Sequence, residues 1–163
     1  LFELKDEYKK QVDDLYEKIN PKGLHAISVH HRLGDYLNPG TKEYHGNLDI
    51  NYYLDAFDKL LTLSGKTSAD YLIVVFSDEI HKVKEYIFYR HHSNVYFVEG
   101  NEDIIDLFLM AKCSDNIISN SSFSYWAYLL NKNKNKLCVA PRNWFKNAPC
   151  DTKNLYLPEM IVI

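Results

Sequence analysis

Residues 30–36, His-His-Arg-Leu-Gly-Asp-Tyr, combine residue types that could bind a phosphate group. Arg32 offers a planar guanidinium whose N–H groups match two phosphate oxygens. Gly34 lets the backbone approach a ligand closely because it has no Cβ atom, and Asp35 could orient the arginine or a ligand hydroxyl. The alternative is a surface turn in which the arginine and an aspartate form an ion pair. The residues alone leave both interpretations open.

A metal site is a further interpretation of this segment, since His30, His31 and Asp35 are all common metal ligands. The two histidines follow directly on an apolar run that reads as a strand. Successive side chains of a strand point to opposite faces of the sheet, so adjacent histidines rarely share one ion. We therefore expect no metal at this position.

A second candidate for anion binding lies in residues 120–124, Asn-Ser-Ser-Phe-Ser, which open a predicted helix. Small hydroxyl residues at a helix start offer side-chain oxygens, backbone N–H groups and the positive end of the helix dipole. Ser121 and Ser122 would be the hydroxyl residues of such a site. An ordinary serine N-cap explains the same pattern equally well.

Asp106 lies within a predicted helix, residues 102–113, that is apolar on nearly all sides. Such a helix must be largely buried, and a buried carboxylate needs hydrogen-bond partners or it takes up a proton. The partner could be a neighbouring backbone N–H group. It could also be a ligand that donates two hydrogen bonds, such as the N1 and N2 edge of guanine.

The hydrophobic pattern predicts the elements that must position these residues. Apolar residues at steps of three and four predict helices, and short apolar runs rich in β-branched residues predict strands. Ser77 and Asp78 are well placed to cap the helix that follows them. The expected helices span residues 2–19, 50–63, 79–89, 102–113 and 122–131, and the expected strands span residues 24–30, 71–76, 95–98, 116–119 and 137–140.

Strands that are apolar on both faces and alternate with helices are typical of a parallel sheet covered on both sides. We therefore expect a doubly wound α/β domain with about five strands. Ligands of such sheets bind beyond the carboxyl ends of the strands. The informative residues are those that follow each strand, at 30–36, 77–78, 99–101 and 120–123.

The composition excludes several classes of protein and of partner. The 163 residues are 46% hydrophobic and 25% charged, with a net charge of -3, which is the profile of a globular domain. No apolar run approaches the ~18–20 residues that span a membrane, and no cluster of cations offers a grip on nucleic acid. Sixteen lysines stand against three arginines, Arg32, Arg90 and Arg142. Either each arginine is kept for bidentate binding, or codon bias explains the difference.

The cysteines indicate neither a zinc site nor a disulfide framework. Cys113, Cys138 and Cys150 are widely spaced and form no CxxC pair. Reduced thiols fit a cytosolic protein. Cys113 and Cys138 lie in apolar runs, so we expect them to be buried as small hydrophobic residues.

Several segments of the chain resemble one enzyme family. ISVHHRLGDYL at 27–37 resembles the HxRRxD signature shared by α1,2-, α1,6- and protein O-fucosyltransferases. Its VHxRxGDY pattern is most similar to glycosyltransferase family 11, the α1,2-fucosyltransferases. The resemblance covers residues 25–163, and the further matching segments are NYYLDAF at 51–57, VVFSDEI at 74–80, DLFLMAKCSDNIISNSSFSYWAYLL at 106–130, PRNWF at 141–145 and TKNLYLPEMIVI at 152–163.

The resemblance implies a GT-B architecture, in which two Rossmann-like domains face each other and the C-terminal one holds most of the donor site. Residues 24–163 would be this GDP-fucose-binding domain. Residues 1–23 would be a boundary helix leading from a missing N-terminal domain, so the isolated chain would be inactive. The expected partners are GDP-fucose, a glycan acceptor and that N-terminal domain, with no nucleic acid.

The resemblance also implies roles for individual residues. The first arginine of the signature, here Arg32, would grip the β-phosphate of GDP-fucose. An aspartate followed sixteen residues later by a hydroxyl residue would hold guanine and the pyrophosphate, which implies Asp106 and Ser122. The full set of expected substrate-binding residues is Arg32, Gly34, Asp78, Asp106, Ser121, Ser122 and Phe123.

The implied chemistry is inverting transfer without a metal or other cofactor, with O2 of galactose as the expected acceptor. Charge develops on the leaving β-phosphate, so catalysis would depend largely on Arg32 and the helix start stabilising that charge. His30 and Asp35 are candidates for the general base by position only, and a base from the missing domain is an equal candidate. The family usually has a second arginine where this chain has Leu33, so weaker donor binding or another GDP-sugar is an open alternative.

Other functions remain open at this point. The domain could bind a nucleotide sugar without catalysis, or it could use a protein acceptor. A flavodoxin-like redox or signalling domain fits the same succession of elements, but neither an acidic phosphorylation pocket nor a flavin loop is visible. The expected location is the cytoplasm, with membrane association as an alternative, or the Golgi if a eukaryotic parent carries an N-terminal anchor.

Overall fold

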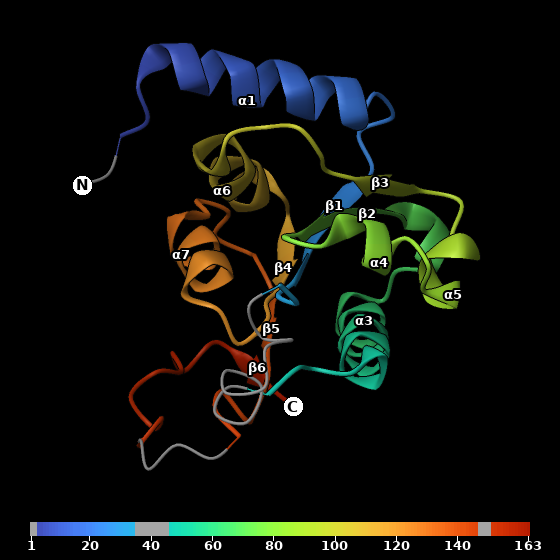
Figure 1. Ribbon diagram of the computed structural model, residues 1–163. Coiled ribbons are helices and arrows are strands. Elements are labelled where there is room, and N and C mark those ends of the chain that lie inside the picture. The colour runs from blue at the N-terminus through green and yellow to red at the C-terminus, as the bar shows by residue number, and fades with distance from the viewer. Residues whose placement is uncertain (1–2, 35–45, 147–150) are drawn as a thin grey trace.

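Parallel strands form one twisted sheet at the centre of the computed structural model (Figure 1), which describes residues 3–34, 46–146 and 151–163. In these ranges the sheet has six strands in the order β3-β2-β1-β4-β5-β6. The chain therefore runs outward from β1 on one side and returns to the other side of β1 through β4. The strands are β1 His25–His31, β2 Tyr71–Ser77, β3 Val95–Phe97, β4 Asp115–Ile117, β5 Cys138–Ala140 and β6 Ile161–Val162.

Helices cover both faces of the sheet (Figure 1). One face packs on α3 Ile50–Ser64, α4 Ile80–Val83 and α5 Ile87–Arg90, and the other on α1 Asp6–Ile19, α6 Asp103–Lys112 and α7 Ser122–Leu130. A short 3-10 helix, η2 Ser68–Asp70, precedes β2. In β1, Ile27 and Val29 face the first layer while Ala26 faces the second, as the two-residue period of a strand requires. The expected doubly wound, Rossmann-like parallel sheet is confirmed.

Helix α3 begins and ends where its sequence indicates. The Asp49 carboxylate accepts hydrogen bonds from the N–H groups of Asn51 and Tyr52, at 2.7 and 3.4 Å. Gly65 ends the helix in the left-handed region at φ 67°, which costs a residue without a Cβ atom little. The start of α3 is thus fixed, and it lies near the carboxyl ends of the strands.

Two predictions about the elements were wrong. The helix expected over 79–89 is two short helices, because buried Val83 and Tyr89 both face the same core. Six residues of continuous helix turn through about 600° and would separate their directions by about 120°, so the chain breaks at Tyr86 instead. The sheet also gains β6, which has only two residues and no hydrophobic period to mark it.

Ser77 and Asp78 do not cap the helix that follows them, contrary to the prediction. Glu79 is the N-cap of α4, and no side chain caps that position. The Ser77 hydroxyl accepts only the N–H group of Glu79 itself, at 3.0 Å. Asp78 is engaged elsewhere, with the segment that follows β1.

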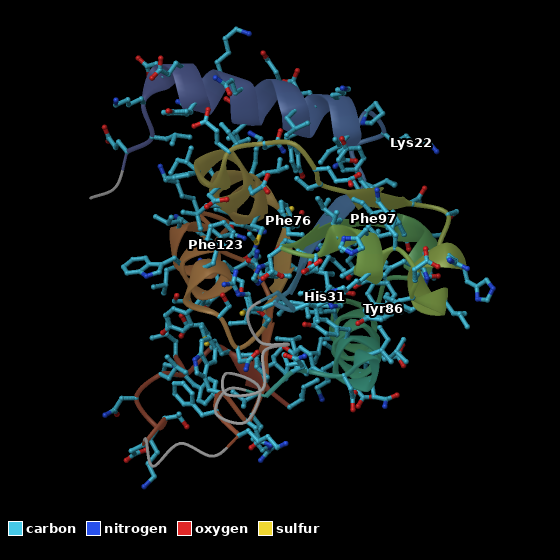
Figure 2. All side chains as sticks on the ribbon, in the orientation of Figure 1. Lys22, His31, Phe76, Tyr86, Phe97 and Phe123 are labelled. Atoms are coloured by element: carbon cyan, nitrogen blue, oxygen red, sulfur yellow. The ribbon has the colours of Figure 1, made fainter. Side chains whose placement is uncertain are left out.

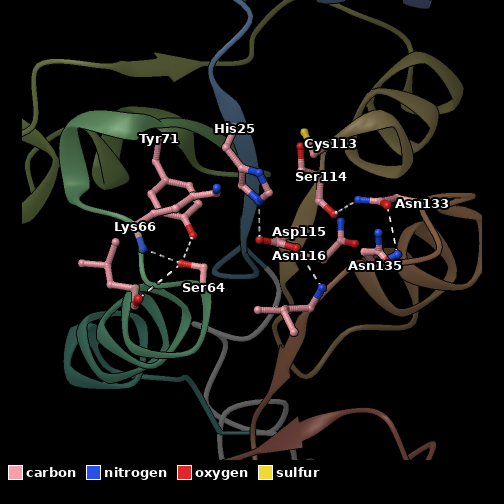
Figure 3. A network of polar contacts seen from close by, with 12 residues as sticks. His25, Ser64, Lys66, Tyr71, Cys113, Ser114, Asp115, Asn116, Asn133 and Asn135 are labelled. Atoms are coloured by element: carbon pink, nitrogen blue, oxygen red, sulfur yellow. Dashed lines mark hydrogen bonds and ion pairs between the residues drawn. The ribbon is translucent and has the colours of Figure 1, made fainter.

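Figure 3 shows a polar network at the amino-terminal edge of the sheet. His25 Nε2 lies 2.6 Å from Oδ2 of Asp115, and Oδ1 of Asp115 accepts the N–H group of Leu137 at 2.7 Å. The Asp115 side chain is 2% exposed, and its bonds join β1, β4 and the entry to β5. This network holds the sheet at the edge opposite to the expected ligand site.

The predictions about the cysteines, the first helix and membrane-spanning segments remain to be compared with the structure. Cys113 and Cys138 are buried, as expected, and burial raises the pKa of both thiols. Cys150 lies outside the described residues. Helix α1 packs on α6 through Val12 and Ile19, while the division of the chain at residues 23 and 24 stays a prediction. Within the described ranges, we find no helix with the length and apolarity needed to cross a membrane.

Candidate functional site

Several of the candidate residues lie where the order of strands reverses. β1 pairs with both β2 and β4, so the segments after these three strands meet at one edge of the sheet. They are residues 32–34, 77–78 and 119–124. A reversal of this kind opens a crevice at the carboxyl ends of the strands, where open α/β sheets bind ligands.

Asp78 holds the segment that follows β1. Its Oδ2 lies 3.1 Å from Nη1 of Arg32 and accepts the N–H group of Gly34 at 3.0 Å, while its Oδ1 accepts the N–H group of Leu33 at 2.9 Å. Arg32 and Asp78 keep 33% and 24% of their side chains exposed. The surface ion pair considered from the sequence therefore forms, with Asp78 as the aspartate, and it orients Arg32 at the edge of the sheet.

Gly34 is required by this contact. A Cβ atom at this position would lie 2.6 Å from Oδ2 of Asp78, closer than nonbonded atoms come. Both oxygens of Asp78 contact the chain itself, and its predicted role in substrate binding stays a prediction. Asp78 and Gly34 together shape the backbone that carries Arg32.

His30 connects β1 to the start of α7. Its Nδ1 lies 2.8 Å from the hydroxyl of Ser119, and its ring lies 5.7 Å from that of Phe123. His30 is 4% exposed. Burial lowers its pKa to about 4, the Asp78 carboxylate opposes this shift, and Arg32 adds a smaller lowering. The imidazole is thus neutral near pH 7 and a weak base, and its predicted role as general base stays a prediction.

His31 points to the opposite face, as the strand geometry requires. It is buried, stacks on Tyr53 at 3.7 Å and lies 2.5 Å from the hydroxyl of Tyr89. Figure 2 shows His31 and Tyr86 on the α3 side of the sheet and Phe123 on the α7 side. The two imidazoles cannot share an ion, and no group of three or more His, Cys, Asp or Glu side chains suited to a metal occurs in the part of the chain that the structure describes.

The start of α7 shows the serine N-cap that the sequence indicated, and the anion site stays a prediction. Ser121 is the N-cap, and its hydroxyl accepts the N–H group of Phe123 at 3.3 Å. Ser122 is exposed in the first turn, and Ser124 is buried and donates to the carbonyl of Ser121 at 3.3 Å. The cap fixes the helix start and leaves the Ser122 side chain facing solvent.

Asp106 lies in the first turn of α6 and is partly buried. Its Oδ1 accepts a hydrogen bond from Nδ2 of Asn101 at 3.0 Å, which is neither of the two partners considered from the sequence. Burial raises the pKa of this carboxyl, and the bond from Asn101 opposes the shift. A ligand that donates to Asp106 would offset the cost of keeping it charged.

The structure describes one of two further residues of the signature segment, Leu33, but not the other, Asp35. Leu33 is 7% exposed and packs in the core with α3, so an arginine at this position would replace a buried apolar side chain. Asp35 lies outside the described residues, and its predicted catalytic role stays a prediction.

The sequence did not indicate the structural roles of Ser119 and Asn120, which connect the segments of the site. Ser119 was assigned to a strand, and its bond to His30 spans 89 positions of the chain. Asn120 is buried and donates to the carbonyls of Gly46 and Trp144, at 3.3 and 3.2 Å. A polar residue directly after a buried strand is the only signal that could have marked either one.

Comparison with known proteins places the chain in a family. The model of glycosyl transferase family 11 matches residues 2–163. The O-antigen biosynthesis glycosyltransferase WbnK of Escherichia coli is 36% identical over 151 residues, which are 89% of this chain and 48% of that protein. An alpha-1,2-colitosyltransferase of Escherichia coli is 32% identical over 168 residues, 90% of this chain and 56% of that protein. The chain thus spans about half the length of these relatives.

Solved structures share the fold at low sequence identity. NodZ α1,6-fucosyltransferase soaked with GDP-fucose superposes with a TM-score of 0.51 at 18% identity, over 78% of this chain and 43% of that one. NodZ from Bradyrhizobium gives a TM-score of 0.54 at 21% identity, over 78% and 42%. With a family match along nearly its whole length and relatives above 30% identity, this chain belongs to glycosyl transferase family 11.

Proposed function

We propose that this chain is the donor-binding domain of a glycosyltransferase that binds GDP-fucose and transfers fucose to a glycan hydroxyl. The observation that carries the proposal is the arrangement at the strand reversal. Arg32 is oriented by Asp78. His30 contacts Ser119, whose hydroxyl lies 3.5 Å from that of Ser124 in the first turn of α7. A cation and a helix N-terminus at one crevice suit a diphosphate.

In this mechanism Arg32 and the first turn of α7 stabilise the charge that grows on the leaving β-phosphate. Such stabilisation acts in the transition state more than in the ground state, so it raises the rate of transfer. Asp78 and Gly34 hold Arg32 in place, and Asp106 accepts hydrogen bonds from guanine. His30, neutral before the reaction, positions Ser119.

The acceptor, the linkage and the second domain belong to this proposal as well. An α1,2 linkage to galactose is proposed from the family resemblance. The acceptor-side domain is proposed to lie in the half of the relatives' length that this chain does not span, and transfer would need both domains. The general base is proposed to be Asp35, His30 or a residue of that second domain.

A second candidate donor sugar has its own support. One relative, 32% identical, carries the name alpha-1,2-colitosyltransferase, so a colitosyl donor is a reasonable alternative to a fucosyl donor. The phosphate and guanine contacts would be the same for both. Only the surroundings of the sugar would differ.

Calorimetry of the chain with GDP-fucose, GDP-mannose, UDP-galactose and ADP tests the proposal. We expect binding of both GDP-sugars without added magnesium, tighter for GDP-fucose, and much weaker binding of UDP-galactose and ADP. Equal affinity for ADP and the GDP-sugars would contradict the assignment of a guanine site. Equal affinity for the two GDP-sugars would leave the domain a GDP-binding unit without the proposed sugar preference.

A further inference from the structure

A cavity lies at the same edge of the sheet, beside β5 and β6. It has a volume of about 630 Å³, and we call it the β5–β6 cavity. One wall comes from residues between 46 and 55, at the start of α3, and the other from residues 141–146 after β5, with Ile163 at one side. The volume lies in the range of small-molecule sites.

Hydrogen bonds from Asn120 connect the walls of the cavity to the segment that precedes α7. Asn120, 2% exposed, donates to the carbonyl of Gly46 in one wall and to that of Trp144 beside the other. Asn120 directly precedes Ser121, the N-cap of α7. One buried amide therefore joins both walls to the start of the helix that we propose as the phosphate site.

The backbone that carries Arg142 is also held. The N–H group of Arg142 donates to the carbonyl of Ile163 at 2.7 Å, and its carbonyl accepts the hydroxyl of Tyr156 at 3.0 Å. The same hydroxyl donates to the carbonyl of Pro141 at 2.6 Å. Arg142 thus projects from a fixed point of the cavity wall.

The side chains that line the cavity suit hydroxyl groups. Asn51 and Asn143 carry amides that both donate and accept, Asp55 accepts, and Arg142 donates. A sugar hydroxyl can satisfy each of these groups because it is donor and acceptor at once. The half-buried ring of Phe145 adds an apolar surface for the C–H face of a sugar ring.

The charge of the lining favours a neutral ligand. The lining includes two carboxylates, Asp49 and Asp55, and two cations, Arg142 and Lys146. An anion such as phosphate would need an excess of cations, and an apolar ligand would leave these polar groups without partners. The lining is therefore suited to a polar molecule without net charge.

The position of the cavity relates it to the proposed diphosphate site. Arg32, Ser121 and Arg142 follow β1, β4 and β5, which are successive strands of the sheet. Neighbouring strands lie about 4.8 Å apart, so the cavity begins about one strand spacing beyond the start of α7. That step is comparable to the width of one sugar ring.

We propose that the β5–β6 cavity binds a neutral saccharide unit next to the diphosphate. The inference rests on the proposed function. This saccharide unit could be the sugar of the donor or a sugar of the acceptor, because both offer the same hydroxyl groups. Asp55, Asn143 and Arg142 supply its polar contacts.

Two substitutions with matched controls test the cavity. Asp55→Ala and Arg142→Ala remove exposed lining groups, while Asp58→Ala changes the next aspartate of α3 and Arg90→Ala an exposed arginine of α5. Calorimetry measures the affinity of each variant for GDP and, separately, for GDP-fucose. Saturation-transfer NMR measures lactose, with and without GDP present.

If the cavity holds the donor sugar, we expect both lining substitutions to reduce the affinity for GDP-fucose about tenfold and to leave the affinity for GDP unchanged. If the cavity holds a sugar of the acceptor, we expect the wild-type chain to give a lactose signal and both lining variants to lose it. The controls should behave as wild type in either arm. The inference is overturned if both lining variants match the controls for GDP-fucose and lactose, or if the wild-type chain shows neither a sugar contribution to GDP-fucose affinity nor a lactose signal. Failure of GDP to bind the wild-type chain would count against the proposed function alone, since lactose is also measured without nucleotide.

Discussion

At the scale of single residues, Arg32 depends on its neighbours for its direction. Asp78 contacts its guanidinium and both following N–H groups, and Gly34 leaves the room for that carboxylate. The side chain stays partly exposed at the carboxyl-terminal edge of the sheet. Its function should therefore depend on the planar shape of the guanidinium as well as on its charge.

Arg32→Lys keeps the charge and removes the planar pair of donors. A hydrogen bond to a charged group contributes ~1.5–3 kcal/mol, so we expect calorimetry to show GDP affinity reduced about tenfold or more. Arg90→Lys, on exposed α5, is the control and should leave affinity unchanged. Undiminished GDP binding by Arg32→Lys would remove Arg32 from the site.

Substitution of Asp106 tests recognition of the guanine base of GDP rather than of its phosphates. Asp106→Asn places an N–H donor against the donors of guanine, and a mismatched buried donor costs ~1–3 kcal/mol. The preference for GDP over ADP should fall about tenfold, while the exposed Asp103→Asn in the same helical turn keeps it. If Asp106→Asn lowers the melting temperature and preserves the preference, the residue supports the fold and not the ligand.

At the scale of elements, the sequence was informative where a local pattern exists. The apolar period marked α3, α6 and α7, the apolar runs marked five strands, and strand ends marked the candidate residues. The sequence could not indicate contacts set by topology. Asp78 reaches Leu33 across 45 positions and His30 reaches Ser119 across 89, because β2 and β4 happen to flank β1. No local pattern reports which strands will be neighbours.

The contact between the ends of β1 and β2 gives a prediction at this scale. Gly34→Ala would place a Cβ atom 2.6 Å from Oδ2 of Asp78, so the carboxylate must move and lose its bonds to the loop. We expect GDP affinity to fall several-fold in a protein that remains folded by circular dichroism. In an Asp78→Ala background the same substitution should add little, because the contact is already absent. Additive losses in this cycle would show that the two residues act independently.

At the scale of the whole molecule, one sheet carries a different histidine environment on each face. Burial lowers the pKa of His30 to about 4 and that of His31 to about 3, whereas an unfolded histidine titrates near 6.5. Between pH 7 and pH 5 the unfolded chain gains protons that the folded chain does not. Stability must therefore fall as the pH falls, since the folded pKa values lie below the unfolded one.

Each buried histidine should contribute about 2 kcal/mol of lost stability between pH 7 and pH 5. Urea unfolding at the two pH values measures the difference. His31→Phe keeps a ring against Tyr53 and should show roughly half the pH dependence, while the exposed His91→Gln should match the wild type. Equal stability of the wild-type chain at both pH values would contradict the burial of these neutral imidazoles.

The central claim is that GDP binds where the strand order reverses, and backbone amide NMR of the chain titrated with GDP tests it most directly. We predict shifts for the N–H groups of residues 32–34 and 121–123, which follow β1 and begin α7, and for Asp106. The N–H groups of His25 and Lys66, at the opposite edge of the sheet, should not move. Shifts centred on that opposite edge, or no shifts at all at saturating GDP, would contradict the account.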